Sequence, residues 1–161
     1  MRRHEREITD PKKIQAILEK CDVCRIGLTD ETAPYIVPMN FGFSLENGLL
    51  TLYFHGASEG RKLDLIRKNP HVGWEMDTNH QLLEGGNLPC RYGMAYQSLI
   101  GTGTITILET TEEKQFGLQK IMEHYAPPRR WHFPPESLKH VTVLALHITS
   151  ISGKERNFQV L

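Results

Sequence analysis

The chain has 161 residues, with 19 basic and 19 acidic side chains, so its formal net charge is zero. This length suits one domain with its own hydrophobic core, and we expect a single domain over residues 1–161. The charge balance argues against nucleic acid or a membrane surface as the main partner. No apolar run approaches the ~20 residues that span a bilayer, and the start of the chain lacks a secretory signal, which predicts a cytoplasmic protein.

Three cysteines, at positions 21, 24 and 90, predict reduced thiols rather than a disulfide framework. Cys21 and Cys24 form a C-x-x-C motif, but a helix precedes it, whereas a thioredoxin motif needs a strand before it and a helix after it. A zinc site would need a second pair of ligands. The pattern therefore favours ordinary packing of Cys21 at a helix end and Cys24 in a strand over a redox or metal role.

Six segments carry the patterns of β-strands. The alternation of Cys24, Ile26 and Leu28 is typical of a strand with one buried face. The pair Asn47-Gly48 predicts a tight hairpin. Because few helices separate the strands, a small antiparallel barrel of six strands with peripheral helices fits better than a doubly wound sheet. The predicted strands cover residues 23–28, 33–43, 49–55, 71–76, 96–108 and 142–151.

Three helices are predicted from the residues at their starts. Asp10-Pro11 supplies a cap and a first helical residue, and Thr110 with Glu113 has capping-box spacing. A third helix is expected to begin near Ser58. The prolines between residues 127 and 135 are expected to break the chain.

Two features of the chain suggest functional positions. Pro38 lies inside the predicted strand 33–43, and proline cannot donate to a ladder, so this position is an edge, a bulge or a place where the backbone serves something other than a neighbouring strand. Residues 77–91 are polar and contain glycines, which predicts a long loop of the kind that often contacts a ligand or partner.

The segment from Ser58 to Lys62 predicts an anion site at a helix start. Backbone N–H groups in the first turn of a helix lack internal partners and lie at the positive end of the dipole. Arg61 and Lys62 would add charge-assisted hydrogen bonds to a phosphate. The same residues could instead be a serine cap and two solvated cations, and the segment alone does not separate these interpretations.

Five motifs occur in an order typical of one family: residues 34–42, 52–57, 60–63, 69–72 and 96–101. On these motifs the chain resembles the pyridoxamine 5′-phosphate oxidase-like FMN-binding split barrels, and within them the branch related to nitroimidazole resistance proteins. The resemblance covers nearly the whole chain. It implies a mainly β split barrel that binds FMN at the interface of a homodimer.

The resemblance also implies which residues meet the cofactor. The backbone of residues 38–40 would face the polar edge of the isoalloxazine ring, and His55 and Ala57 would lie along the ribityl chain or ring. Arg61 and Lys62 would bind the phosphate, and residues 97 and 98 would offer hydrogen bonds to phosphate or ring. The expected cofactor-binding residues are Pro38, Met39, Asn40, His55, Ala57, Ser58, Arg61, Lys62, Gln97 and Ser98.

The expected function is that of an FMN-dependent oxidoreductase acting on a small molecule, with nitroaromatic compounds among the candidates. No side chain needs to be a nucleophile, because the flavin carries the redox chemistry. The tail after residue 153 does not resemble the segment with which the oxidase that makes pyridoxal phosphate recognises its substrate, which argues against that activity. The alternative is a non-catalytic protein that stores flavin, or holds haem through His124 or His132.

Overall fold

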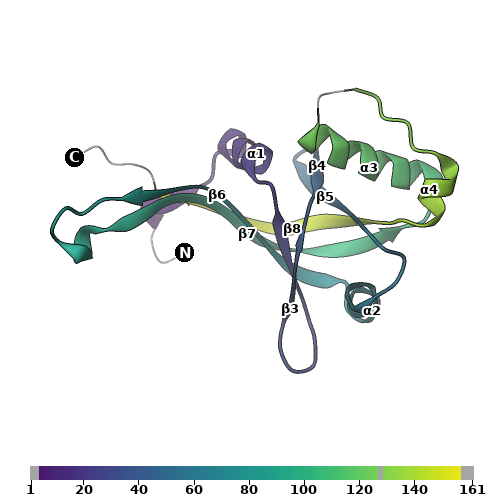
Figure 1. Cartoon of the computed structure of the whole chain (residues 1–161), viewed down its shortest axis with the longest axis horizontal. Helices are drawn as coiled ribbons and strands as arrows, with labels where there is room; N and C mark the ends of the chain where they lie inside the picture. Colours follow the sequence, from purple (N-terminus) through teal and green to yellow (C-terminus); the bar gives the residue numbers. More distant parts are fainter. Residues whose placement is uncertain (1–3, 127–128, 157–161) are drawn as a thin grey trace.

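The computed structural model describes residues 4–126 and 129–156, and Figure 1 shows a curved sheet with helices around it. Eight strands form one antiparallel sheet in the order β3-β2-β6-β7-β8-β5-β4, with the short β1 paired to β8. The predicted mainly β fold with peripheral helices is confirmed. The strands are β1 (Glu7–Ile8), β2 (Cys24–Leu28), β3 (Tyr35–Met39), β4 (Gly42–Glu46), β5 (Leu49–Gly56), β6 (His71–Leu83), β7 (Gly93–Leu108) and β8 (Thr142–Arg156).

The two edge strands of the sheet are neighbours in the sequence. β3 and β4 stand at opposite ends of the strand order, yet only residues 40 and 41 join them. The sheet must therefore curl until its edges approach, although no ladder between β3 and β4 closes it within the described residues. The strand count is eight rather than six, because the predicted run 33–43 divides in two and β1 was not predicted. Pro38 lies on the edge strand β3, and an edge is one of the three positions that the sequence allowed for it.

Four α-helices of the described part lie around the sheet: α1 (Pro11–Lys20), α2 (Arg61–Lys68), α3 (Thr111–Tyr125) and α4 (Pro135–Lys139). The Asp10 side chain caps α1, and Thr110 with Glu113 forms a full capping box at α3, both as predicted. The prediction missed α4. Its first residue is Pro135, and the first position of a helix needs no N–H donor. The prolines were expected to interrupt regular structure, but here one of them begins a helix.

Strands β6 and β7 continue together as an arm that reaches beyond the rest of the sheet (Figure 1). Their pairing extends to Leu83 and Gly93 after a bulge between Thr78 and Gln81, so residues 77–83 are strand rather than the predicted loop. Most side chains in this part of β6 are exposed or only half-buried, and the alternation that identifies a strand is therefore missing from the sequence. β8 likewise runs past the predicted residue 151 to Arg156, because it pairs with β7.

The hydrophobic core lies where α1 and α2 pack against the sheet. Trp74 is 3 % exposed and belongs to this core. No helix within residues 4–126 and 129–156 is long and apolar enough to cross a membrane. The largest fully buried side chains are Ile17, Leu18, Ile26, Leu28, Phe41, Leu52, Phe54, Leu63, Met76, Leu99, Leu144 and Leu146.

Candidate functional site

The N-terminus of α2 is capped by a glycine rather than by the predicted serine. Gly60 has a φ of 123°, which residues with a Cβ rarely adopt. Its carbonyl accepts from the N–H groups of Leu63 and Asp64 at 2.9 and 3.3 Å, and within the described residues no side chain caps the helix. Ser58 is exposed and precedes the helix by three residues. The N–H groups of Arg61 and Lys62 have no side-chain acceptor among the described residues, which leaves these two donors available to an anion.

Lys62 directs its ammonium group towards the end of the sheet. Its Nζ lies 3.6 Å from Sδ of Met39. A Cβ placed on Gly56 would lie 2.9 Å from the same Nζ, so the ammonium occupies space that any other residue at position 56 would need. Burial lowers the pKa of Lys62, and no carboxylate of the described chain forms an ion pair with it. A half-buried cation without a counter-ion is costly, and an anion beside it would offset that cost.

Arg61 points away from Lys62, towards the hairpin that joins β2 to β3. Its Nη2 donates to Oδ2 of Asp30, and its guanidinium lies 4.7 Å above the centroid of the Tyr35 ring. This guanidinium holds the pKa of the Asp30 carboxyl below its usual range. Successive helical residues project about 100° apart, which separates the two cations in this conformation.

The strand end at residues 38–40 reaches Lys62 through Met39, whose side chain is buried. Pro38 is exposed and stands opposite Arg25 in the β2–β3 ladder. Exposed His55 lies at the end of β5, next to Gly56, and Ala57 continues into the segment before α2. The structure thus brings the predicted residues from β3, β5 and α2 into one region.

Tyr125, at the end of α3, fixes the link between the two edge strands. Its hydroxyl donates to the carbonyl of Asp22 at 2.7 Å and accepts from the N–H of Phe41 at 3.0 Å. Asn40 contributes to the same link, because its Nδ2 donates to the Asp22 carbonyl at 3.3 Å. The backbone of residues 39–41 is therefore held from a helix distant in sequence.

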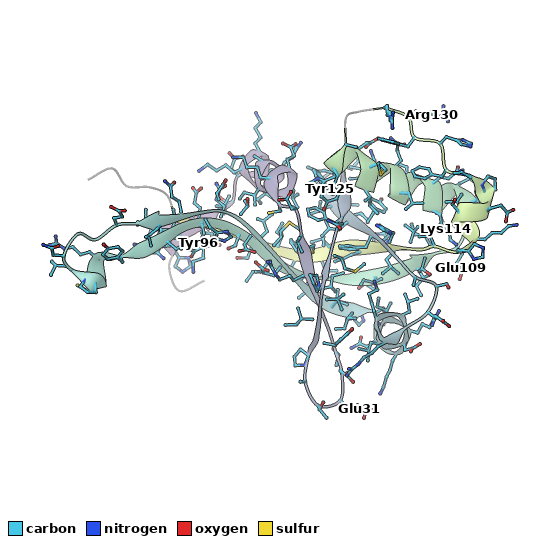
Figure 2. All side chains as sticks on the ribbon, in the orientation of Figure 1. Glu31, Tyr96, Glu109, Lys114, Tyr125 and Arg130 are labelled. Atoms are coloured by element: carbon cyan, nitrogen blue, oxygen red, sulfur yellow. The ribbon has the colours of Figure 1, made fainter. Side chains whose placement is uncertain are left out.

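Gln97 and Ser98 lie apart from the other predicted residues within one chain. Ser98 pairs with Asp77 of β6. Two strands, β6 and β2, separate β7 from β3, a distance of about 14 Å at ordinary strand spacing. The Gln97 amide accepts from Asn79 and donates to Glu155. Figure 2 shows neighbouring Tyr96 on the arm, far from α2. Residues 97 and 98 do not join the α2 site in the single chain.

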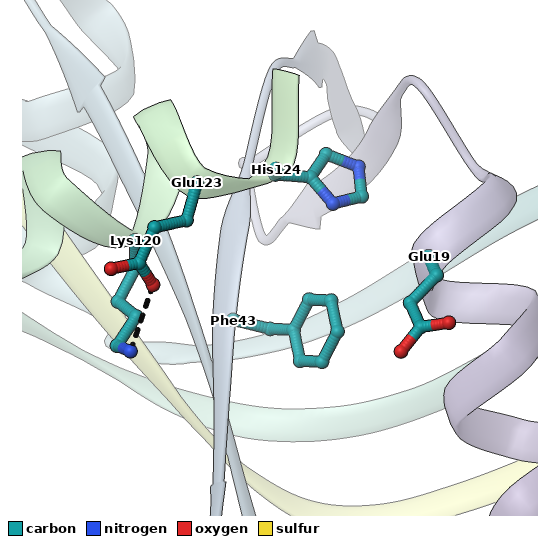
Figure 3. A pocket seen from close by; sticks show the side chains of 5 residues that line it. All are labelled: Glu19, Phe43, Lys120, Glu123 and His124. Atoms are coloured by element: carbon teal, nitrogen blue, oxygen red, sulfur yellow. Dashed lines mark hydrogen bonds and ion pairs between the residues drawn. The ribbon is translucent and has the colours of Figure 1, made fainter. Parts of the chain in front are cut away.

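A separate pocket of about 300 Å³ opens between α1 and α3 (Figure 3). Its polar side chains already have partners: Lys120 Nζ donates to Glu123 at 2.9 Å, and Gln15 donates to Glu19 at 2.9 Å. The Cys21 carbonyl can only accept, so His124 Nε2 is the donor of their 2.8 Å hydrogen bond. His124 is one of the two candidate haem ligands of the alternative function. It lies within α3, with its ring 4.5 Å from that of Phe41.

The C-x-x-C cysteines are buried in the positions predicted for packing residues. Cys21 follows α1 as its C-cap, and Cys24 begins β2. Burial is the largest cause that raises the pKa of each thiol to about 12, so both are protonated near neutral pH. Neither has the low pKa that a reactive thiol needs.

Comparison with known proteins assigns the family. The model of the family described as pyridoxamine 5′-phosphate oxidase matches residues 10–155. The chain belongs to this family. Its fold is therefore the split-barrel fold of pyridoxamine 5′-phosphate oxidase-like proteins, in the open, eight-stranded form described above. Among curated protein sequences, none matches the chain.

Solved structures place the chain within the same family. A proposed 5-nitroimidazole antibiotic resistance protein from Bacteroides thetaiotaomicron is 31 % identical, with a TM-score of 0.79 over 92 % of this chain and 86 % of the other. A proposed pyridoxamine 5′-phosphate oxidase from Listeria innocua is 25 % identical, with a TM-score of 0.58 over 91 % of this chain and 98 % of the other. An FAD- and haem-binding protein from Mycobacterium smegmatis shares the fold at 17 % identity, with a TM-score of 0.82 over 95 % of this chain and 74 % of the other.

Three residues that shape the site in this family member were not predicted. Gly56 leaves room for the Lys62 ammonium, Asp30 pairs with Arg61, and Tyr125 holds the end of β3. Gly56 lies between two predicted site residues, and a glycine at a strand end is a signal for close approach of another group. Asp30 and Tyr125 act through long-range contacts, for which the sequence carries no local signal.

Proposed function

We propose that the protein is an FMN-binding flavoprotein that acts as an oxidoreductase on a small molecule, with the flavin at a homodimer interface. The observation that carries the proposal is Lys62, a half-buried ammonium with no carboxylate partner in the described chain. It lies at the start of α2, where Gly60 offers no capping side chain, beside Met39 and Gly56. A phosphate there would receive charge-assisted bonds from the side chain and further bonds from backbone N–H groups.

The chain's own residues bind and orient the cofactor in this proposal. Lys62 and the start of α2 hold the phosphate, and the backbone of residues 38–40 pairs with the polar edge of the ring. His55, Ala57 and Ser58 line the path between them. The flavin, when bound, supplies the electron transfer, and the protein supplies position and electrostatics.

A second copy of the chain is needed for the remaining predicted contacts. Gln97 and Ser98 lie about three strand spacings from β3 in one chain, which supports the proposal that they contact the flavin from the partner subunit. One face of the sheet suits such a partner. Ile36 and Ile100 are 63 % and 51 % exposed there, and between them the ladder carries two glycines with no side chains above them, Gly27 and Gly73.

The cofactor test compares two double variants on the same helix. Arg61→Ala/Lys62→Ala removes both cations at the start of α2, and Arg67→Ala/Lys68→Ala removes two cations at its end. FMN titration followed by flavin fluorescence should show a loss of about 10- to 100-fold per phosphate-binding cation in the first variant only. A wild-type protein that stays colourless after FMN addition would refute the proposal. Equal losses in both variants would place the phosphate elsewhere.

The dimer test changes the exposed sheet face. Ile36→Glu and Ile100→Glu should each shift the protein from dimer to monomer in analytical ultracentrifugation and weaken FMN binding at the same time. Leu49→Glu is the matched control, because Leu49 is 71 % exposed on the β4–β5 hairpin. A wild-type monomer that binds FMN tightly would show that one chain completes the site.

The substrate proposal rests on the relative that is 31 % identical, which is described as a 5-nitroimidazole antibiotic resistance protein. We propose nitroaromatic compounds as the first class to test as electron acceptors. The assay follows their reduction by the FMN-loaded dimer with nicotinamide donors, with quinones as the comparison class. No turnover of any acceptor would favour the non-catalytic alternative, in which the barrel stores flavin. Haem binding through His124 would first require its bond to the Cys21 carbonyl to break.

A further inference from the structure

The β2–β3 hairpin is tied to α2 by polar contacts at both ends of the helix. Arg61, in the first turn, pairs with Asp30, and Lys68, in the last turn, pairs with Glu31 at 3.0 Å. Between these pairs and the sheet, Asn69 donates to the hydroxyl of Thr29 at 3.3 Å. Figure 2 shows Glu31 at the tip of this hairpin. Asp30 is thus held against the helix start that the proposed function assigns to the phosphate.

Asp30 neutralises one of the two cations at that start. The side chain of Asp30 is 15 % exposed, and its second oxygen accepts from the N–H of Glu31 at 2.8 Å, so the carboxylate is fixed within the hairpin. The paired guanidinium of Arg61 stacks on Tyr35, away from the ammonium of Lys62. While Asp30 is paired with Arg61, Lys62 is the cation available to bind the ligand phosphate. Arg61 can bind the same phosphate only after it leaves Asp30.

We propose that Asp30 competes with the ligand phosphate for Arg61 and so sets which flavin phosphate the site prefers. This inference rests on the proposed flavin function. The terminal phosphate of FMN carries nearly two negative charges near neutral pH, whereas each phosphate of the FAD diphosphate carries one. A site with one net positive charge discriminates less between them than a site with two. A site with two favours the FMN phosphate, because the additional attraction grows with the charge of the ligand.

The test variant is Asp30→Asn, which removes the charge and retains a carbonyl oxygen for the Glu31 N–H bond. Its matched control is Glu31→Gln, which breaks the neighbouring hairpin–helix pair without touching Arg61. Dissociation constants are measured by flavin fluorescence for FMN, FAD and riboflavin, the last of which has no phosphate. FMN titrations are repeated at several salt concentrations.

Asp30→Asn should bind FMN about two- to fivefold more tightly, since an exposed ion pair of this kind contributes modestly. FAD should gain less and riboflavin nothing, and the salt dependence of FMN binding should steepen. Glu31→Gln should match the wild type. In a background that already carries Arg61→Ala, Asp30→Asn should have no effect on FMN binding, because the cation for which Asp30 and the phosphate compete is gone.

Two results would overturn the inference while leaving the proposed function intact. One is unchanged or weaker FMN binding in Asp30→Asn, which would mean that Asp30 orients Arg61 for the phosphate. The other is an equal gain for riboflavin, which would mean that the hairpin acts on the ring. If the wild type binds neither FMN nor riboflavin, the proposed function fails, and this inference fails with it.

Discussion

The contact between Gly42 and α3 leads to a sharp prediction about how the site is supported. Gly42 begins β4 directly beneath the helix, where an added Cβ would lie 2.2 Å from the carbonyl carbon of Lys120 and 2.3 Å from the amide nitrogen of Ile121. Ordinary contacts of this kind exceed 3.4 Å, so Gly42→Ala must move backbone by more than an ångström. Overpacking a close contact costs about 1–3 kcal/mol, and we expect the upper end because neither backbone can rotate away.

For a chain of this length, a loss of about 3 kcal/mol corresponds to a fall of about 6–12 °C in Tm. Gly42→Ala should also weaken FMN binding, since α3 carries the Tyr125 hydroxyl that holds Phe41. Calorimetry and FMN titration measure the two effects. Gly56→Ala is the control, because its Cβ meets only the movable end of Lys62, so Tm should change little while FMN binding weakens. A Tm of Gly42→Ala within a degree or so of the wild type would refute the packing described here.

Three further predictions follow from single contacts. FMN affinity should fall as pH rises through the pKa of Lys62, because only the charged ammonium attracts phosphate. Burial lowers this pKa from its usual 10.5. In the same titrations Lys62→Arg should keep its FMN affinity up to about pH 10. Tyr125→Phe should lower the free energy of unfolding by about 1 kcal/mol in urea titrations. It removes the acceptor of the Phe41 N–H and leaves the Asp22 carbonyl with the Asn40 amide as its donor. A thiol reagent should label exposed Cys90 in the native protein, and Cys21 and Cys24 only after unfolding. Burial raises the pKa of each of these two thiols to about 12. Rapid labelling of all three thiols in the native protein would contradict this prediction.

The elements predicted correctly are those whose signals are local. The cap of α1 at Asp10, the hairpin at Asn47-Gly48 and the capping box of α3 each depend on a few adjacent residues. Asn47 and Gly48 both adopt positive φ, as a tight hairpin turn requires. Such signals locate the ends of helices and strands without any contribution from tertiary contacts.

The strands whose bounds were predicted incorrectly are those that depend on a partner strand. The outer part of β6 has polar or exposed side chains, and only its pairing with β7 makes it a strand. β8 extends to Arg156 for the same reason. The division of residues 33–43 into β3 and β4 follows from the curl of the whole sheet, because each half joins a different edge. No periodicity within a segment reports these pairings.

In the candidate site, too, local signals predict position but not long-range contacts. Arg61 and Lys62 are adjacent cations at a helix start, and nothing in the sequence distinguishes their roles. The structure gives one of them a carboxylate partner from a hairpin about thirty residues earlier, and leaves the other half-buried beside Met39 without a carboxylate partner among the described residues. The two therefore differ as candidate phosphate ligands: the Lys62 ammonium already lies at the proposed site, whereas Arg61 would have to exchange one anion for another. A helix start with two basic residues predicts where an anion binds, but its net charge, and hence its preference among anions, depends on residues brought to it by the fold.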